Sequence, residues 1–231
     1  MSRAWALSLF LVAYGNVASL VLGTATPTGP WPGVVVGLLL LIIVLTWRRS
    51  SPPLTATELG LTWRGLSRSV ALGLLLALGA AVPAVLFLRF PPLVGQPVEY
   101  APLGSLSREA LVWRACVWMP LDTAIPEEVA FRGVLLATLR RHCADVRAAL
   151  ISAAVFTAWH GVIVSRTVAL TNLQAEPLLA TLGLLGAFVA ISVGGMLFAW
   201  LRLFTCHLAG SVVAHWAFNA VLLLGLAGVA G

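Results

Sequence analysis

Long apolar runs alternate with short polar segments along almost the whole chain. Each run approaches the roughly 20 helical residues that cross a bilayer. We therefore predict an all-α fold, a polytopic membrane helical bundle of about seven transmembrane helices, in which residues 1–231 form a single integral membrane domain. The predicted spans are 4–22, 31–47, 69–90, 107–139, 148–165, 180–203 and 207–229.

Two of these runs have features that qualify the prediction. Arg3 and the small residues of "GTATP" would also suit a signal peptide over 4–22, although the length of the run favours a retained helix. The run 107–139 is too long for one simple span and contains Pro120 and Pro126. Proline interrupts the helical hydrogen-bond ladder, so we predict a kink or break just before Glu127.

Composition supports a membrane location. The 231 residues are 60% hydrophobic and only 10% charged, whereas soluble domains carry about 25% charge. A net charge of +6 would suggest a nucleic-acid partner in a soluble protein, but here the arginines cluster between apolar runs. We therefore expect the lipid bilayer, and no nucleic acid, as the partner of this surface. The three cysteines show no pairing or metal-ligand spacing.

The arginines also predict an orientation. They are dense in alternate loops and sparse in the intervening ones, so the positive-inside rule places the N-terminus and the dense loops in the cytoplasm. Within the N-terminal region 1–68, the stretch 48–68 reads as an amphipathic linker helix on that face. Short loops are typical of a bacterial inner-membrane protein. The dense loops contain Arg48, Arg49, Arg64, Arg68, Arg140, Arg141, Arg147 and Arg202.

Charges inside a predicted span are expensive and indicate function by default. Glu127, Glu128 and Arg132 lie together in "AIPEEVAFRGVLLATL". Glu128 and Arg132 are four residues apart and can pair on one helix face, whereas Glu127 points about 100° away. We expect the pair to fix the helix and Glu127 to take a proton from water. A purely architectural Glu–Arg cluster is the alternative.

Further polar residues recur in two later spans. His160 ends "FTAWH", and the last span places His207, Ser211, His215 and Asn219 four residues apart on one stripe. Glu127 lies 13 positions before Arg140, and His160 lies 13 positions after Arg147. At about 1.5 Å per residue, both are roughly 20 Å from the cytoplasmic ends of their helices. This shared depth predicts one cluster with a base, an acid and oxyanion donors, as amide hydrolysis requires.

These motifs resemble the CPBP, or Abi, family of intramembrane proteases, which includes the type II CAAX prenyl endopeptidases. The matching residues are "EEVAFRG" at 127–133, Phe156 with His160, and His215 with Asn219. The resemblance covers roughly 107–229, the expected catalytic core. It implies peptide-bond hydrolysis in a water-filled cavity open to the cytoplasm.

By similarity, Glu127 and His160 activate the water, and His215 with Asn219 stabilises the oxyanion. Glu128, Arg132, Phe156 and Ser211 would support them. The substrate would be a membrane-associated or lipid-anchored protein or peptide. We favour a mechanism without a cofactor, although Glu127, His160 and His215 could form a zinc site with an open position. A small transporter or a non-catalytic membrane scaffold would belong to other functional classes.

The span 180–203 carries small residues at helical spacing. Gly186, Ala190 and Gly194 are four residues apart, and such spacing lets helices approach closely in lipid. We predict that this face packs on the last span and holds His215 and Asn219 in place.

Overall fold

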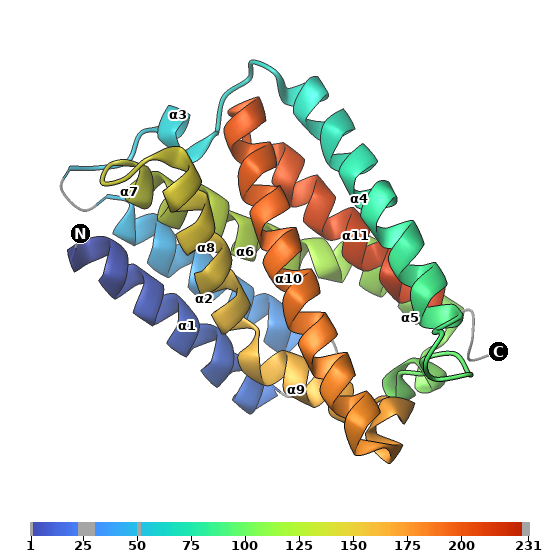
Figure 1. The fold of residues 1–231 in the computed structure, drawn as a ribbon. Coiled ribbons are helices and arrows are strands. Elements are labelled where there is room, and N and C mark those ends of the chain that lie inside the picture. The colour runs from blue at the N-terminus through green and yellow to red at the C-terminus, as the bar shows by residue number, and fades with distance from the viewer. Residues whose placement is uncertain (1, 23–30, 50–51, 228–231) are drawn as a thin grey trace.

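The computed structural model describes residues 2–22, 31–49 and 52–227, which form a bundle of helices (Figure 1). Within these residues the only β-type pairing is an isolated bridge between Tyr100 and Thr171. The predicted all-α class is confirmed. The principal helices are α1 (Ser2–Leu22), α2 (Trp31–Trp47), α4 (Leu66–Arg89), α8 (Asp145–Trp159), α9 (Gly161–Ala169), α10 (Pro177–Thr205) and α11 (Leu208–Ala227). Two short 3₁₀ segments are η1 (Ala101–Ser105) and η5 (Asn172–Ala175).

Several of these helices are suited to cross a membrane. Of the described helices, 4 are long and apolar enough for a complete span, namely α1, α4, α10 and α11. The pair α8 and α9 would form one more span, bent by 47° at the break between them. Helix α2 is apolar but has only 17 residues. The chain is thus a multi-pass membrane protein, and a total of about seven spans stays a prediction.

Of the predicted kink or break before Glu127, the break is wrong, because the chain stays helical from Arg108 to Arg140 through both prolines; a kink there stays a prediction. Most of this run is π-helical. A π-helix has a wider turn than an α-helix, and π segments inside α-helices occur frequently at functional sites. The run consists of α5 (Arg108–Trp113), η2 (Arg114–Trp118), η3 (Pro120–Ala124), α6 (Ile125–Glu128), η4 (Val129–Leu135) and α7 (Leu136–Arg140), in which η2, η3 and η4 are the π segments.

The predicted amphipathic helix over 48–68 is also wrong, since in the described residues between α2 and α4 (Leu66–Arg89) only α3 (Ala56–Leu59) is helical. Thr55 and Glu58 form a reciprocal capping box at its start. Gly60 ends it in the left-handed conformation, with φ of 74°, which glycine adopts without steric cost. Helix α3 is therefore a single helical turn that is capped at both ends.

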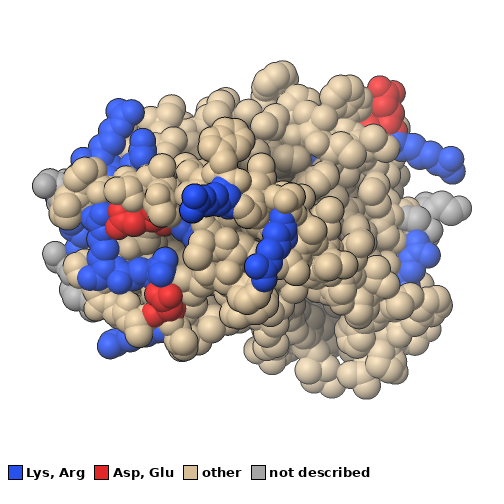
Figure 2. Space-filling view, turned by 90° about the horizontal axis from the view of Figure 1, so that it is seen from above, with Lys and Arg blue, Asp and Glu red and all other residues tan. Residues whose placement is uncertain are grey.

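The helical run 108–140 passes through the middle of the bundle (Figure 1). Helices α1, α2 and α8 pack around its second half, where Leu7, Leu11, Leu40, Phe131 and Trp159 belong to one apolar core. Helices α4, α10 and α11 lie on the other side. Figure 2 shows basic side chains gathered at one end of the molecule, the end at which Figure 1 places the N-terminus, α3 and α7.

Close packing through glycine occurs between different helices from those predicted. A Cβ atom at Gly73 of α4 would lie 2.4 Å from the carbonyl oxygen of Gly210 in α11. At Gly186 and Gly194 of α10, a Cβ atom would meet nothing within 4 Å. The predicted tight contact of α10 with α11 at Gly194 is therefore wrong. The tight glycine of α10 is Gly195, where a Cβ atom would lie 3.3 Å from the Phe156 ring of α8.

Candidate active site

Three parts of the chain bring their polar side chains to one place inside the bundle. Glu127 and Glu128 come from α6, His160 from the break between α8 and α9, and His215 from α11. One oxygen of Glu127, Oε2, lies 3.7 Å from Nε2 of His160, and Oε1 of Glu128 lies 3.0 Å from Nδ1 of His215. Of the residues predicted to cluster, Glu127 lies beside His160, and His215 lies beside Glu128; the place of Asn219 in the cluster stays a prediction.

One half of this cluster is sealed from solvent. Arg132 donates from Nη1 to Glu128 Oε1 at 2.8 Å and from Nη2 to the carbonyl oxygen of Gly195 at 3.1 Å. Both charged side chains have 0% exposed surface. The guanidinium carbon of Arg132 lies 4.1 Å from the centre of the Phe156 ring, so Phe156 stabilises the cation through its π face. Glu128 thereby bonds to η4 and α11, and Arg132 extends the network to α10.

His215 belongs to the sealed half, and its side chain is 6% exposed. Its ring stacks on Phe198 of α10, with centroids 5.3 Å apart. Ser211, one turn earlier, is fully buried and donates to the carbonyl of Leu208 at 2.9 Å. His207 lies outside the predicted stripe, because it precedes α11 and accepts the backbone N–H of Ala209.

The other half of the cluster is more accessible. The side chains of His160 and Glu127 are 15% and 11% exposed. Within the described residues, Oε2 of Glu127 is buried and has no hydrogen-bond partner, and the same is true of Oε2 of Glu128 in the sealed half. A buried polar atom of this kind is uncommon in folded proteins.

Hydrogen-bond partners define which ring nitrogen carries the proton in each histidine. Nδ1 of His160 lies 2.7 Å from the carbonyl oxygen of Phe156, which can only accept, so this nitrogen is the donor. Glu128, as the counter-ion of Arg132, accepts in the same way from Nδ1 of His215. In the neutral rings, Nε2 of both histidines is therefore an acceptor, and it becomes a donor when the ring takes a second proton.

Asn219 follows His215 by one turn on α11 and is partly buried. In the part of the chain that the structure describes, its side chain forms no hydrogen bond with protein. Its amide group is therefore able to donate two hydrogen bonds to a ligand.

Glu127, His160 and His215 are all residue types that can bind a metal ion. A zinc site requires three or four ligands at about 2 Å from one point. Among the described residues, no three His, Cys, Asp or Glu side chains are grouped in this way. The bond from Nδ1 of His215 to Glu128 leaves Nε2 of that ring free. The set Glu127, His160 and His215 would need rearrangement to coordinate one ion.

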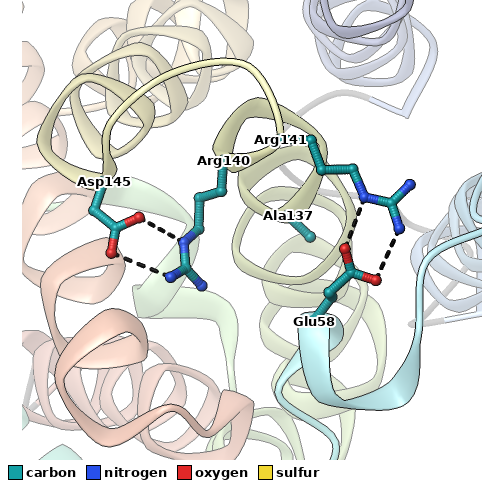
Figure 3. A pocket seen from close by; sticks show the side chains of 5 residues that line it. All are labelled: Glu58, Ala137, Arg140, Arg141 and Asp145. Carbon is teal, nitrogen blue, oxygen red and sulfur yellow. Dashed lines mark hydrogen bonds and ion pairs between the residues drawn. The ribbon is translucent and has the colours of Figure 1, made fainter.

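A separate polar group lies at the arginine-rich end. Figure 3 shows a pocket of 240 Å³ lined by Glu58, Ala137, Arg140, Arg141 and Asp145. Arg141 forms two hydrogen bonds with Glu58, and Arg140 forms two with Asp145. Arg141 lowers the pKa of Glu58 to about 2. The Glu58–Arg141 pair joins α3 to the end of α7, and the Arg140–Asp145 pair joins α7 to the start of α8. Glu58 was not among the residues predicted from the sequence, although "TATE" has the spacing of a capping box.

The fold and the cluster together define a class: a multi-pass helical membrane protein with a buried Glu, Arg and His site. Residues 109–221 match the family model Rce1-like, described as type II CAAX prenyl endopeptidase Rce1-like. The matched part of the chain contains the whole cluster from Glu127 to Asn219, and the match confirms the family resemblance of the motifs. No curated protein and no solved structure matches the chain.

Proposed function

We propose that the protein is an intramembrane endopeptidase that hydrolyses a peptide bond in a membrane-associated or lipid-anchored protein or peptide. The observation that carries the proposal is the accessible pair of Glu127 and His160 beside the sealed group of Glu128, Arg132 and His215. The match to the Rce1-like family model supports the class of reaction.

The accessible pair is suited to hold the attacking water. Oε2 of Glu127 and Nε2 of His160 are both acceptors and are 3.7 Å apart, too far for a direct hydrogen bond. One water oxygen can lie at about 2.8 Å from both and donate one hydrogen to each. As its oxygen attacks the carbonyl carbon, the water gives one proton to this pair, with Glu127 as the general base. The pair later returns that proton to the leaving amine nitrogen as the C–N bond breaks.

The remaining residues would stabilise the oxyanion. Asn219 has a free amide group, and its N–H groups are suitable donors. His215 donates from Nε2 when its ring is protonated, and the Glu128 carboxylate is the counter-ion of that positive charge. Arg132 and Phe198 fix the positions of Glu128 and His215 respectively.

The location of the site suggests where the substrate enters. The arginine-rich end is proposed to face the cytoplasm with the N-terminus, in the orientation of a bacterial inner-membrane protein. Cysteine labelling at positions 53–68 tests this orientation, since labelling from the outside alone would contradict it. A substrate in the membrane or at its cytoplasmic edge would then reach the cluster.

Glu127→Gln tests the function directly, because glutamine keeps the size of the side chain and removes the base. We expect turnover to fall by about 10²–10⁴-fold, the usual contribution of a general base, at unchanged membrane abundance. The assay measures cleavage of a quenched fluorescent peptide with a prenylated CAAX end and of its unprenylated form. C-terminal peptides of the membrane proteome, compared with and without the protein, cover other substrates. Wild-type and Glu127→Gln membranes with identical products would point to a scaffold or transporter.

The metal-independent form of this mechanism has its own test. We expect cleavage to continue at an unchanged rate after dialysis against 1,10-phenanthroline and EDTA. A loss of activity that zinc alone restores would favour the alternative in which Glu127, His160 and His215 bind the ion.

A further inference from the structure

The break beside His160 leaves backbone groups that need partners. Helix α8 ends at Trp159 and α9 begins at Gly161, with a bend of 47° between them. The last carbonyls of a helix and the first N–H groups of the next have no intrahelical partner. Inside a bilayer such groups must be satisfied by the protein itself.

Asn16 of α1 satisfies one group on each side of this break. Its Nδ2 donates to the carbonyl oxygen of Ala158 at 2.9 Å, and its Oδ1 accepts the N–H of Val162 at 2.8 Å. The same Nδ2 donates to the carbonyl of Val12 in its own helix at 2.8 Å, which fixes the amide in one orientation. One side chain from a distant helix therefore joins the end of α8 to the start of α9.

The residues next to Asn16 bring α1 close to the break. A Cβ atom at Gly15 would lie 2.3 Å from the ring of Trp159, so only glycine allows this approach. Tyr14 stacks on the same Trp159 ring, with centroids 5.9 Å apart, and its hydroxyl donates to the carbonyl of Val36 at 2.7 Å. We call Tyr14, Gly15 and Asn16 the α1 clamp.

The shape of the break controls the direction of the His160 ring. The backbone N–H of His160 bonds to Thr157, three residues back, and not to Phe156. The Phe156 carbonyl is thus available to accept from Nδ1 of His160 at 2.7 Å. That bond directs Nε2 toward Glu127. A change in the angle at the break would move the imidazole away from the carboxylate.

We propose that Asn16 is a positioning residue for the reaction, and that through the α1 clamp it holds His160 opposite Glu127. The expected change in kcat rests on the proposed function, whereas the expected change in the position of His160 does not. It makes α1, which carries none of the family motifs, a part of the active-site unit.

The test uses the full chain in nanodiscs, with Asn16→Leu as the main variant and Ser8→Ala as the matched control. Ser8 is a buried polar residue of the same helix, but its hydroxyl bonds only within α1, to Ala4. ¹⁵N NMR of labelled histidines reports the environment of His160, assigned with His160→Gln. We expect Asn16→Leu to shift the His160 signals and to lower kcat about 10- to 100-fold, as displacements of about 1 Å do, with KM within about threefold. Ser8→Ala should change neither.

Two further variants keep the inference testable if Asn16→Leu does not fold. Asn16→Asp keeps the acceptor for Val162 and should retain more kcat than Asn16→Leu. Gly161→Ala keeps Asn16 but adds a Cβ atom 3.0 Å from its Oδ1, and should shift the His160 signals in the same direction.

Unchanged His160 signals and kcat in Asn16→Leu, or in Gly161→Ala if Asn16→Leu does not fold, would overturn the inference. If the wild-type protein cleaves nothing, the proposed function fails, and the NMR comparison still decides whether Asn16 positions His160.

Discussion

Glu127 and Glu128 are adjacent in sequence, yet they belong to two regions with opposite properties. Glu128 lies in the sealed region and is engaged by Arg132 and His215. Glu127 lies in the accessible region, where its side chain is 11% exposed and Oε2 lies 3.7 Å from Nε2 of His160. Among the described residues, one oxygen of each carboxylate has no hydrogen-bond partner. The rotation of about 100° between neighbours on a helix accounts for this difference. The two identical side chains thus differ in chemistry because their surroundings differ.

The sealed region illustrates why buried charges are arranged as networks. An ion removed from water requires compensation by an opposite charge and by hydrogen bonds. Arg132 obtains both, from the Glu128 carboxylate and from the Gly195 carbonyl. Every contact that compensates a charge also fixes a position, so this region can serve as the rigid support of the accessible one.

The largest expected effect on stability is that of Glu128→Ala. This change leaves Arg132 as an unpaired buried charge, which costs about 3–5 kcal/mol. We expect a marked loss of membrane abundance and of thermal stability in detergent. The matched variant Glu127→Ala removes a less constrained carboxylate and should stay close to wild type in both measurements. Equal stability of the two variants, with activity lost only in Glu128→Ala, would reverse the roles of the two regions.

A smaller effect is expected from the support that α10 gives to the sealed region. Leucine at Gly195 would press on Phe156 and Ala153, which a Cβ atom already approaches to 3.3–3.4 Å. Overpacking of this kind costs about 1–3 kcal/mol, and it would displace the carbonyl that binds Arg132. Activity should fall strongly while the protein still inserts.

Gly194→Leu is the control for this prediction, because a Cβ atom there meets nothing within 4 Å. It should change stability by no more than about 0.5 kcal/mol, like other surface substitutions. A Gly194→Leu variant as inactive as Gly195→Leu would show that α10 acts through bulk packing and not through the Arg132 contact.

The sequence predicts the cluster well because charges stand out in so apolar a chain. Glu127, Glu128 and Arg132 could be found because they are charged residues inside an apolar run, and helical spacing predicted the pairing of the last two. The position of the helix break could not be found in this way. Proline suggested a break at Pro126, but the chain remains helical there, whereas the observed break at His160 has no proline.

The break at His160 depends on Asn16, which is 144 positions earlier in the chain. Such tertiary hydrogen bonds leave no local signal. The glycine contacts were missed for a related reason, since glycine and alanine are common in every apolar run here. Only the structure distinguishes Gly195, in close contact, from Gly194, in open space.

The smallest expected effect concerns a third ionic region, the exposed pair of Glu58 and Arg141. Their side chains are 33% and 28% exposed, and exposed pairs contribute about 0.2–1 kcal/mol. Glu58→Gln keeps the capping box, because glutamine can replace glutamate there, and removes the charge together with one of the two acceptors of Arg141. We expect a loss of less than about 1 kcal/mol at pH 7, measured by thermal unfolding in detergent and reduced by added salt.

The pH dependence of this pair has a definite sign. Arg141 lowers the pKa of Glu58 from its usual 4.5 to about 2 in the folded protein. A carboxyl whose folded pKa is depressed contributes stability above its unfolded pKa and loses it as the pH falls through the folded one. The difference in unfolding free energy between wild type and Glu58→Gln should therefore be fully present above pH 4.5 and disappear as the pH approaches 2. A Glu58→Gln variant as unstable as Glu128→Ala would contradict the comparison, because it would mean that exposure does not set the strength of an ion pair in this protein.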